Sequence, residues 1–465
     1  MHWSCCRISM INDTEAEWLF VLDAMYPYIE KALPKTCIKN VVVIPVNRSM
    51  GSAVKLLAAM KSQTRSILRA NTPCRFMHWN DFEGIGAAYA GNTEAPYQKG
   101  RPVIMVYSSG STGASKGIVL SNDAANATIT DSLSSGLSYS RGMMYLQMIP
   151  VWFSTGIIQS VLLPLTIGVS VILEPSFKAE TFVKDIIRYK PFFTLVATSI
   201  WLKAMQNKRV QQTGLSFLLY PFTGGEKILP QSEREINAFL RDRGCKTPIM
   251  KGYGMCELGG KVTDSLVANK PGSVGIPMAD ITVSIFDPTT NAELPYGAHG
   301  EIRVNSPSHM SEYYKNQKAT AEYFWTDQNG VTWGCTGDIG YIDEDGLLFV
   351  LGRASDSAIL DSGKRVYLFD IEDVILQEEM LSGCKVVAVK ENGKTVLAAH
   401  MTVRKDAEYN PDTLACRIFE NCKKQLPDEE IPTKFKFRDS FPVHTNGKRD
   451  NHALKQETDG FVAIV

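Results

Sequence analysis

The chain carries, directly after a β-rich run at residues 103–107, the sequence Tyr107-Ser108-Ser109-Gly110-Ser111-Thr112-Gly113-Ala114-Ser115-Lys116-Gly117. Glycines allow backbone N–H groups to close around an anion, hydroxyls donate further hydrogen bonds, and Lys116 adds a positive charge. The spacing does not fit the Gly-x-x-x-x-Gly-Lys-Ser/Thr pattern of a Walker A loop. Such a loop taken alone is often a flexible connector, but the strand before it and the lysine after it favour an anion-binding loop.

Strand-like and helix-like segments alternate on both sides of this loop. Upstream, apolar residues recur at helical spacing over 16–33, and a buried strand is expected over 39–45. Downstream, Ser121 is a favourable N-cap for a helix. The further segments alternate as strand, helix, strand, helix, strand, helix and strand at 145–149, 156–163, 169–173, 181–189, 193–197, 200–205 and 217–222. This alternation predicts an α/β fold with a largely parallel sheet that is covered on both faces.

The pattern changes twice towards the C-terminus. From about residue 272, short β runs at 281–287, 300–304 and 346–351 follow one another without intervening helices, which predicts a β-barrel-like subdomain over about 272–352. A helix is then expected at 367–379. Two strands, 385–390 and 395–402, flank Glu391-Asn392-Gly393-Lys394, where Asn-Gly suits a type I′ hairpin turn. We therefore expect an N-terminal domain of residues 1–352 and a small α+β C-terminal domain of residues 353–465.

Composition and charge narrow the class of protein. The 465 residues are 44% hydrophobic and 21% charged, which is typical of a globular protein with at least two domains. The 49 basic and 49 acidic residues cancel, so nothing favours nucleic acid or an anionic membrane as a partner. The ten cysteines form no CxxC pair, which disfavours zinc, and do not resemble a secreted disulfide framework. Without an apolar signal-peptide region or a clean membrane span, we expect a cytoplasmic protein.

Further motifs follow the loop in a characteristic order. They are Gly224-Gly225-Glu226, Gly252-Tyr253-Gly254-Met255-Cys256-Glu257, Gly272-Ser273-Val274-Gly275-Ile276-Pro277, Gly300-Glu301-Ile302, Thr336-Gly337-Asp338, Gly352-Arg353-Ala354-Ser355-Asp356 and Pro442-Val443-His444-Thr445-Asn446-Gly447-Lys448. Together with the loop, this series resembles the adenylate-forming superfamily of acyl-CoA synthetases, luciferases and nonribosomal adenylation domains. The resemblance extends from about residue 12 to the end of the sequence. It implies a large N-terminal domain of layered α/β sheets and a small, mobile C-terminal domain.

The resemblance also implies roles for individual residues and, as cofactor and co-substrates, Mg²⁺, ATP and CoA. Residues matching those that bind the ATP phosphates are Ser108, Ser109, Gly110, Ser111, Thr112, Gly113, Lys116 and Cys256. Residues matching those that contact adenine or ribose are Gly224, Gly225, Glu226, Tyr253, Asp338 and Arg353. Lys448 matches the catalytic lysine, Glu257 the catalytic ligand of Mg²⁺, Ser355 the hinge, and Gly363 a residue of the CoA channel.

The chemistry of these residues is consistent with such a reaction. A carboxylic acid has a reference pKa of about 4, so it is ionised near neutral pH and attacks the α-phosphate without a general base. The reaction instead needs charge neutralisation and alignment of two anions, which Lys448 and a Mg²⁺ held by Glu257 can supply. Asp338 can accept hydrogen bonds from both ribose hydroxyls. Taken singly, each residue is more often an ordinary surface or salt-bridged charge, and it is their joint order that favours function.

The sequence limits the class of carboxylic acid that is expected as the substrate. Phe153-Ser154-Thr155-Gly156 offers no carboxylate to pair with an α-amino group, which disfavours an amino acid. Gly254 matches the position of a tryptophan that closes the pocket of acetyl-specific relatives, so we expect a medium- or long-chain or an aryl acid. Candidate residues for the acyl pocket are Trp152, Phe153, Thr223, Gly254 and Met255. Trp152 and Phe153 fit equally well as core residues.

Three departures from the family pattern leave alternatives open. Cys256 replaces a phosphate-binding threonine, and a thiol is a weaker donor. Ser115 replaces a proline. The family's first blocks, upstream of 16–33, are absent, so a fragment, a misplaced start or a shortened protein is expected. We favour an acyl-CoA ligase, and the alternatives are a ligase that loads a carrier protein and an inactive fragment that binds nucleotide.

Overall fold

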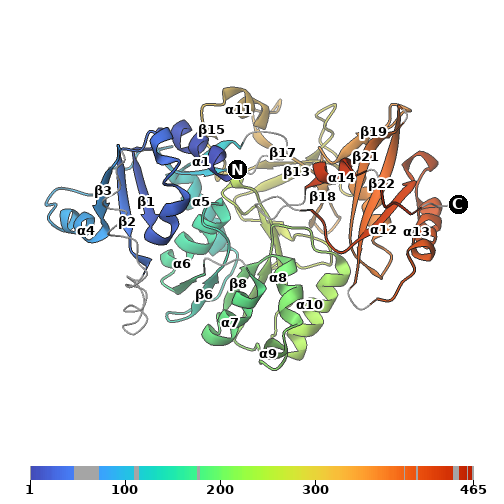
Figure 1. Cartoon of the computed structure of the whole chain (residues 1–465), viewed down its shortest axis with the longest axis horizontal. Helices are drawn as coiled ribbons and strands as arrows, with labels where there is room; N and C mark the ends of the chain where they lie inside the picture. Colours follow the sequence, from blue (N-terminus) through green and yellow to red (C-terminus); the bar gives the residue numbers. More distant parts are fainter. Residues whose placement is uncertain are drawn as a thin grey trace. The chain divides into compact units, whose positions relative to one another are not determined.

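The computed structural model describes residues 2–46, 73–108, 115–174, 178–391, 393–404, 407–442, 450–457 and 459–462. The chain forms two compact units, Met1–Gln98 and Lys99–Val465 (Figure 1). The predicted domain boundary near residue 352 stays a prediction. In the part of the chain that the structure describes, no helix has both the length and the apolar character that a bilayer crossing requires.

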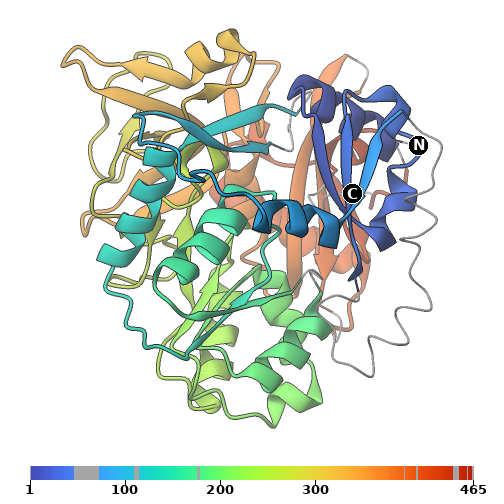
Figure 2. The ribbon, with the colours of Figure 1, turned by 90° about the vertical axis from the view of Figure 1, so that its left-hand side faces the viewer.

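The first unit contains a three-stranded parallel sheet in the order β1-β2-β3 (Figure 2). The strand predicted at 39–45 is confirmed as β2, whose three central valines are fully buried. The helix predicted over 16–33 is wrong. That segment forms β1 and a short 3-10 helix, because Trp18–Leu22 pairs along its whole length with β2 and Pro27 lacks the N–H that a longer helix would use. The elements are α1 (His2–Asp13), β1 (Trp18–Leu22), η1 (Asp23–Tyr28), η2 (Leu33–Lys35), β2 (Asn40–Ile44), β3 (Arg75–His78) and α4 (Trp79–Ala87).

The second unit is built around a seven-stranded sheet in the order β12-β11-β10-β9-β8-β6-β7. Neighbours from β7 to β10 are parallel, so the largely parallel sheet is confirmed, and only the short β11 and β12 are antiparallel. All the strands and helices predicted between 145 and 222 are present, and the segment near 156–163 is wound as a π-helix. The strands are β6 (Met144–Gln147), β7 (Ser170–Leu173), β8 (Phe193–Val196), β9 (Tyr220–Thr223), β10 (Met250–Tyr253), β11 (Thr263–Asp264) and β12 (Ile276–Pro277). The helices are η4 (Thr155–Leu162), α6 (Leu163–Thr166), α7 (Ala179–Tyr189), α8 (Thr198–Met205), α9 (Lys208–Gln211) and α10 (Pro230–Asp242).

The glycine- and serine-rich loop connects two antiparallel strands, β4 (Pro102–Tyr107) and β5 (Gly117–Ser121). A third strand, β15 (Glu312–Tyr313), pairs with the other edge of β5. The helix predicted after Ser121 is α5 (Asn122–Ser134), and the Ser121 hydroxyl caps it by accepting the N–H of Ala124 at 3.0 Å. The pairing with β5 places Glu312 and Tyr313 beside Val119 and Ile118, which lie more than 190 positions earlier in the sequence.

The β-rich subdomain is a five-stranded antiparallel sheet in which β17 is the central strand. The predicted β runs are confirmed, although one helix, α11 (Gln317–Tyr323), intervenes where none was expected. The strand β15, which precedes α11 in the sequence, pairs with β5. This segment therefore contacts the strand that follows the glycine- and serine-rich loop. The strands are β13 (Thr282–Phe286), β14 (Gly300–Asn305), β16 (Phe324–Thr326), β17 (Thr332–Ile342) and β18 (Leu348–Arg353).

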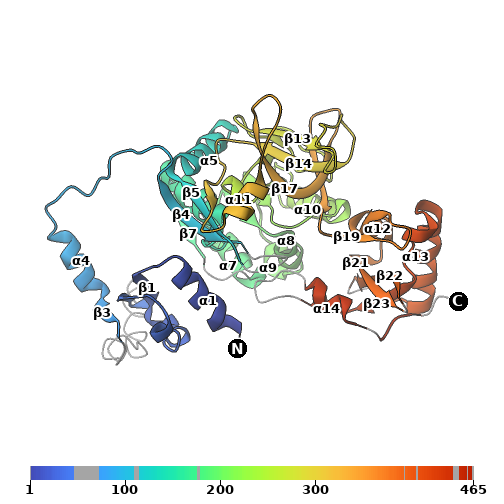
Figure 3. The same cartoon turned by 90° about the horizontal axis from the view of Figure 1, so that it is seen from above.

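The C-terminal residues form an α+β structure with its own hydrophobic core, as the sequence predicts. The sheet order is β21-β22-β23, and α12 and α13 pack beside it (Figure 3). The predicted hairpin is confirmed: Glu391 pairs with Lys394, and Gly393 has a φ of 81°, which glycine adopts without strain. Asn392, its partner in the turn, lies outside the described residues. The elements are β19 (Ser357–Ile359), β20 (Arg365–Tyr367), α12 (Leu368–Ile375), β21 (Leu381–Glu391), β22 (Lys394–Val403), α13 (Pro411–Gln425), η6 (Asp428–Glu430), β23 (Lys434–Arg438) and α14 (Asn451–Lys455).

Candidate active site

Three of the residues predicted to contact the nucleotide meet at one buried carboxylate. Tyr253 ends β10, Asp338 lies within β17, and Arg353 ends β18 directly opposite Asp338. The Tyr253 hydroxyl donates to Asp338 Oδ2 at 2.6 Å, and Arg353 Nε lies 2.9 Å from Asp338 Oδ1. Motifs from the large sheet, the β subdomain and the start of the C-terminal region therefore converge on Asp338.

The environment of Asp338 controls its ionisation. Burial raises the pKa of this carboxyl above its ordinary value, while the Arg353 guanidinium and the Tyr253 hydroxyl act in the opposite direction. Burial and the Asp338 charge raise the pKa of Tyr253 well above 10, so this hydroxyl remains protonated and donates. An ionised carboxylate has about four lone-pair sites. With one donor on each oxygen, two sites remain for a ligand that carries two hydroxyls.

A second cluster joins Glu257 to the anion-binding loop. Glu257 lies in η5 (Cys256–Leu258), immediately after β10, and is 8% exposed. Its Oε1 accepts the hydroxyl of Tyr313 at 2.8 Å, and Lys116 Nζ lies 4.7 Å from the centre of the Tyr313 ring. The charge of Glu257 also contributes to the raised pKa of Asp338, so the two clusters are within electrostatic range of each other. Tyr313 was missed by sequence reasoning, because only the pairing of β15 with β5 brings it here.

The loop itself is described at its two ends. Ser108 and Lys116 close its base: the Ser108 N–H donates to the Lys116 carbonyl at 2.9 Å, and the Ser108 hydroxyl accepts the Lys116 N–H at 3.2 Å. The residues predicted between them, Ser109, Gly110, Ser111, Thr112 and Gly113, lie outside the described residues, as does Lys448. Cys256 is half-buried. The roles of all these residues stay predictions.

The segment predicted to lie against adenine follows β9. Gly225 has a φ of 83°, a conformation that requires glycine. The side chain of Glu226 accepts the N–H of Ser199 at 2.7 Å, in the first turn of α8. A carboxylate is favourable there because the first N–H groups of a helix lack internal partners. This contact explains the glutamate structurally, and its contact with adenine stays a prediction.

The candidate acyl-pocket residues have different environments. Trp152 is 65% exposed, so its interpretation as a core residue is wrong, whereas Phe153 is half-buried. Thr223 is buried, with its hydroxyl 2.9 Å from that of Thr198. A Cβ at Gly254 would collide with the carbonyl group of Gly260, so the close approach of two backbone segments requires glycine there. Met255 packs among buried hydrophobic residues, and the pocket itself stays a prediction.

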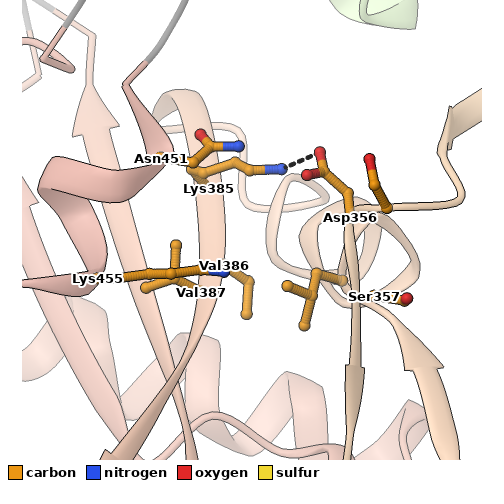
Figure 4. A pocket seen from close by; sticks show the side chains of 9 residues that line it. Asp356, Ser357, Lys385, Val386, Val387, Asn451 and Lys455 are labelled. Atoms are coloured by element: carbon orange, nitrogen blue, oxygen red, sulfur yellow. Dashed lines mark hydrogen bonds and ion pairs between the residues drawn. The ribbon is translucent and has the colours of Figure 1, made fainter. Parts of the chain in front are cut away.

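The predicted hinge residue Ser355 lies between two anchored neighbours. On one side Arg353 is paired with Asp338; on the other, Lys385 Nζ lies 2.8 Å from Asp356 and 3.0 Å from Glu372. Ser355 and Asp356 line a small cavity together with Lys385 and residues of α14, and Figure 4 shows the Lys385 side chain reaching Asp356. Ala354 is also anchored, because its N–H donates to the Gly337 carbonyl at 2.9 Å. The role of Ser355 as a hinge stays a prediction.

Gly363, predicted to line the CoA channel, lies at the exposed turn between β19 and β20. Its φ is 84°, and a Cβ there would meet nothing within 4 Å. Glycine is therefore required by the backbone conformation, not by a close neighbour. Its role in binding CoA stays a prediction.

Comparison with known proteins shows the family of this chain. The family model of AMP-binding enzymes matches residues 8–314, so this chain belongs to that family. It is 25% identical to a long-chain-fatty-acid–CoA ligase of Escherichia coli O6:H1, over 97% of this chain and 79% of that protein. It is 30% identical to the putative acyl–CoA ligase YdaB of Bacillus subtilis, over 76% of this chain and 67% of that protein.

Solved structures establish the fold. The anthranilate CoA ligase AuaEII, crystallised with anthranoyl-AMP, has a TM-score of 0.76 to this chain at 20% identity, and the match covers 97% of this chain and 80% of that one. The predicted α/β architecture, with layered sheets, a β subdomain and a small C-terminal domain, is therefore confirmed.

Proposed function

We propose that this protein is an ATP-dependent acid–thiol ligase that converts a carboxylic acid into an acyl-AMP and transfers the acyl group to CoA. The observation that carries the proposal is the buried Asp338 carboxylate, held by Tyr253 and Arg353 with two lone-pair sites to spare. A ribose presents two neighbouring hydroxyls that match these sites. Membership of the AMP-binding family and the names of the relatives as CoA ligases support the same activity.

The remaining residues would act at the phosphate end of the nucleotide. Lys116 and the loop before it would hold the phosphates, and Glu257 would hold Mg²⁺. Within the described residues, no cluster of three or more His, Cys, Asp or Glu side chains is arranged to hold a metal ion. A single buried carboxylate nevertheless fits Mg²⁺, which is usually bound by one or two carboxylates together with substrate phosphates. When bound, Mg²⁺ would neutralise phosphate charge.

Two half-reactions would make up this activity. In the first, a carboxylate oxygen attacks the α-phosphorus and the bond to pyrophosphate breaks, with Lys448 stabilising the developing charge. In the second, the sulfur of CoA attacks the acyl carbon, the thiol proton is released, and AMP leaves. Rotation about Ser355 would withdraw Lys448 and bring Gly363 to the acyl-AMP between the two steps.

For the acid, we propose a medium- or long-chain or an aryl substrate. A relative is named as a long-chain-fatty-acid ligase, and a structural neighbour as an anthranilate ligase. The exposed Trp152 and the half-buried Phe153 are available for apolar contacts with such an acid. A cytoplasmic location would match the co-substrates ATP and CoA.

An ATP–pyrophosphate exchange assay over a panel of acids tests the proposal. We expect exchange that depends on one class of apolar or aryl acid, and release of AMP with thioester formation once CoA is added. Exchange followed by transfer of the acyl group to a carrier protein but not to CoA would show that the acceptor is a carrier protein. ATP binding without exchange for any acid would contradict ligase activity.

A further inference from the structure

We propose that Tyr313 is a positioning residue that sets the geometry of Glu257 and Lys116 at the phosphate end of the nucleotide site. The proposal rests on the proposed function, because it concerns how Mg²⁺ and ATP are bound together. Tyr313 is 6% exposed and touches both groups: its hydroxyl donates to Glu257 Oε1 at 2.8 Å, and its ring lies 4.7 Å from Lys116 Nζ.

The hydrogen bond can have only one direction. A tyrosine hydroxyl has a reference pKa of about 10 and is protonated near neutral pH, so it donates and the Glu257 carboxylate accepts. One of the two lone pairs of Oε1 is thereby used, whereas within the described residues Oε2 accepts no hydrogen bond and keeps both of its lone pairs. The tyrosine therefore favours Oε2 as the oxygen that binds a cation and fixes the plane of the carboxylate.

The backbone around Tyr313 makes this position rigid. The Met310 N–H donates to the Glu257 carbonyl at 2.7 Å, which ties the segment to η5. Ser311 and Tyr314 donate to the carbonyls of Val119 and Gly117 at 2.8 and 2.7 Å, which tie it to β5. The segment is thus hydrogen-bonded both to the residue that would hold the metal and to the strand that follows Lys116.

The ring of Tyr313 has a separate effect on Lys116. A cation near the face of an aromatic ring is attracted by the ring quadrupole. Lys116 lies one residue before β5, and this attraction holds its ammonium beside the tyrosine that binds Glu257. One side chain therefore keeps an anionic metal ligand and a cationic phosphate ligand at a set separation.

A neighbouring tyrosine provides a matched control. Tyr323 is 4% exposed and packs edge-on against Tyr313, with ring centres 6.2 Å apart. Its hydroxyl is hydrogen-bonded to Nδ1 of His309 at 3.2 Å and not to Glu257. Tyr313→Phe and Tyr323→Phe each remove one buried hydroxyl from the same aromatic cluster, but only the first removes a contact with Glu257.

The experiment measures ATP binding by titration calorimetry over a series of Mg²⁺ concentrations, together with the thermal unfolding of each variant. For Tyr313→Phe we expect the Mg²⁺ concentration that gives half of the maximal gain in ATP affinity to rise about tenfold. Its ATP affinity without Mg²⁺ should stay at the parent value, because the ring remains beside Lys116. Tyr323→Phe should keep the parent Mg²⁺ dependence, even if its melting temperature falls.

A second variant separates the ring from the hydroxyl. Tyr313→Leu should also weaken ATP binding in the absence of Mg²⁺, because Lys116 loses the aromatic face. Parent-like Mg²⁺ dependence in Tyr313→Phe, or an equal shift in Tyr323→Phe, would overturn the proposal and leave Tyr313 as a core residue. If the parent protein itself does not bind ATP with Mg²⁺, it is the proposed function that fails.

Discussion

Replacing Tyr253 with phenylalanine removes one hydroxyl from the candidate nucleotide site and leaves the ring. That hydroxyl donates at 2.6 Å to Asp338, whose side chain is almost fully buried. Burial raises the pKa of Asp338, and Arg353 and Tyr253 are the two neighbours that lower it. Without the Tyr253 hydroxyl, the ionised form loses a donor, so we expect the pKa of Asp338 to rise further.

The size of the effect follows from the strength of the lost bond. A hydrogen bond to a charged group contributes about 1.5–3 kcal/mol net, and one pKa unit corresponds to about 1.4 kcal/mol. The acid limb of kcat/KM for ATP should therefore move about one to two pH units upward in Tyr253→Phe. Because the ionised carboxylate accepts the ligand's hydroxyls, activity is lost below the new pKa, and the variant should approach the parent at higher pH.

The assay is pyrophosphate exchange at low ATP concentration, from about pH 5.5 to about pH 9. Tyr145→Phe is the control, since Tyr145 is also buried but its hydroxyl donates to the neutral carbonyl of Gln159 at 3.1 Å. It should lower the melting temperature without moving the acid limb. Superimposable pH profiles for Tyr253→Phe and the parent, or parent-like ATP affinity in Asp338→Asn, would refute the role of this carboxylate.

Four further outcomes are expected. Lys448→Ala should nearly abolish acyl-adenylate formation and leave ATP affinity little changed, and exchange at the parent rate would exclude Lys448 as the catalytic lysine. Cys256→Thr should lower the KM for ATP, because a hydroxyl is a stronger donor worth about 0.5–1.5 kcal/mol; an unchanged KM would show that the thiol does not contact phosphate. Ser355→Pro, which fixes φ near about −65°, should slow thioester formation more than adenylation in single-turnover experiments, and equal slowing of both would refute the hinge. Burial lowers the pKa of His309 and of His400 to about 4. Below about pH 6.5 the unfolded chain therefore binds more protons than the folded protein, so the melting temperature should fall as the pH drops from about 6.5 to about 4. A melting temperature that stays constant in calorimetry over this range would contradict the prediction.

Local patterns predicted most of the elements, and they failed where pairing between distant segments overrode them. The alternating strands and helices from 145 to 222 were found because periodicity within each segment reports which face is buried. The segment 16–33 has a helical spacing of apolar residues, yet Trp18–Leu22 pairs with Asn40–Ile44 and becomes a strand. The strand with which it pairs lies about 20 residues away, so the pattern within the segment itself does not show that it forms a strand.

The candidate site shows the same division. Motif order alone predicted that Tyr253, Asp338 and Arg353 share a site, and the structure places them in contact. It did not predict that Glu226 would cap α8, because that contact depends on where the helix begins relative to β9. The structure shows that Glu226 accepts a hydrogen bond from the start of α8, and its contact with adenine stays a prediction.

The sequence by itself determined the chemical class of the protein. That class was inferred from the order of glycines, charges and aromatic residues in the motifs, and this order does not depend on how the chain folds. It also determined the strands and helices whose burial pattern is local. Only the tertiary structure decided which side chains hold the site in place. Tyr313 reaches Glu257 and Lys116 because β15 pairs with β5, nearly 200 residues earlier in the chain. Contacts of this kind arise from strand pairing and close packing between distant segments, which no window of neighbouring residues encodes.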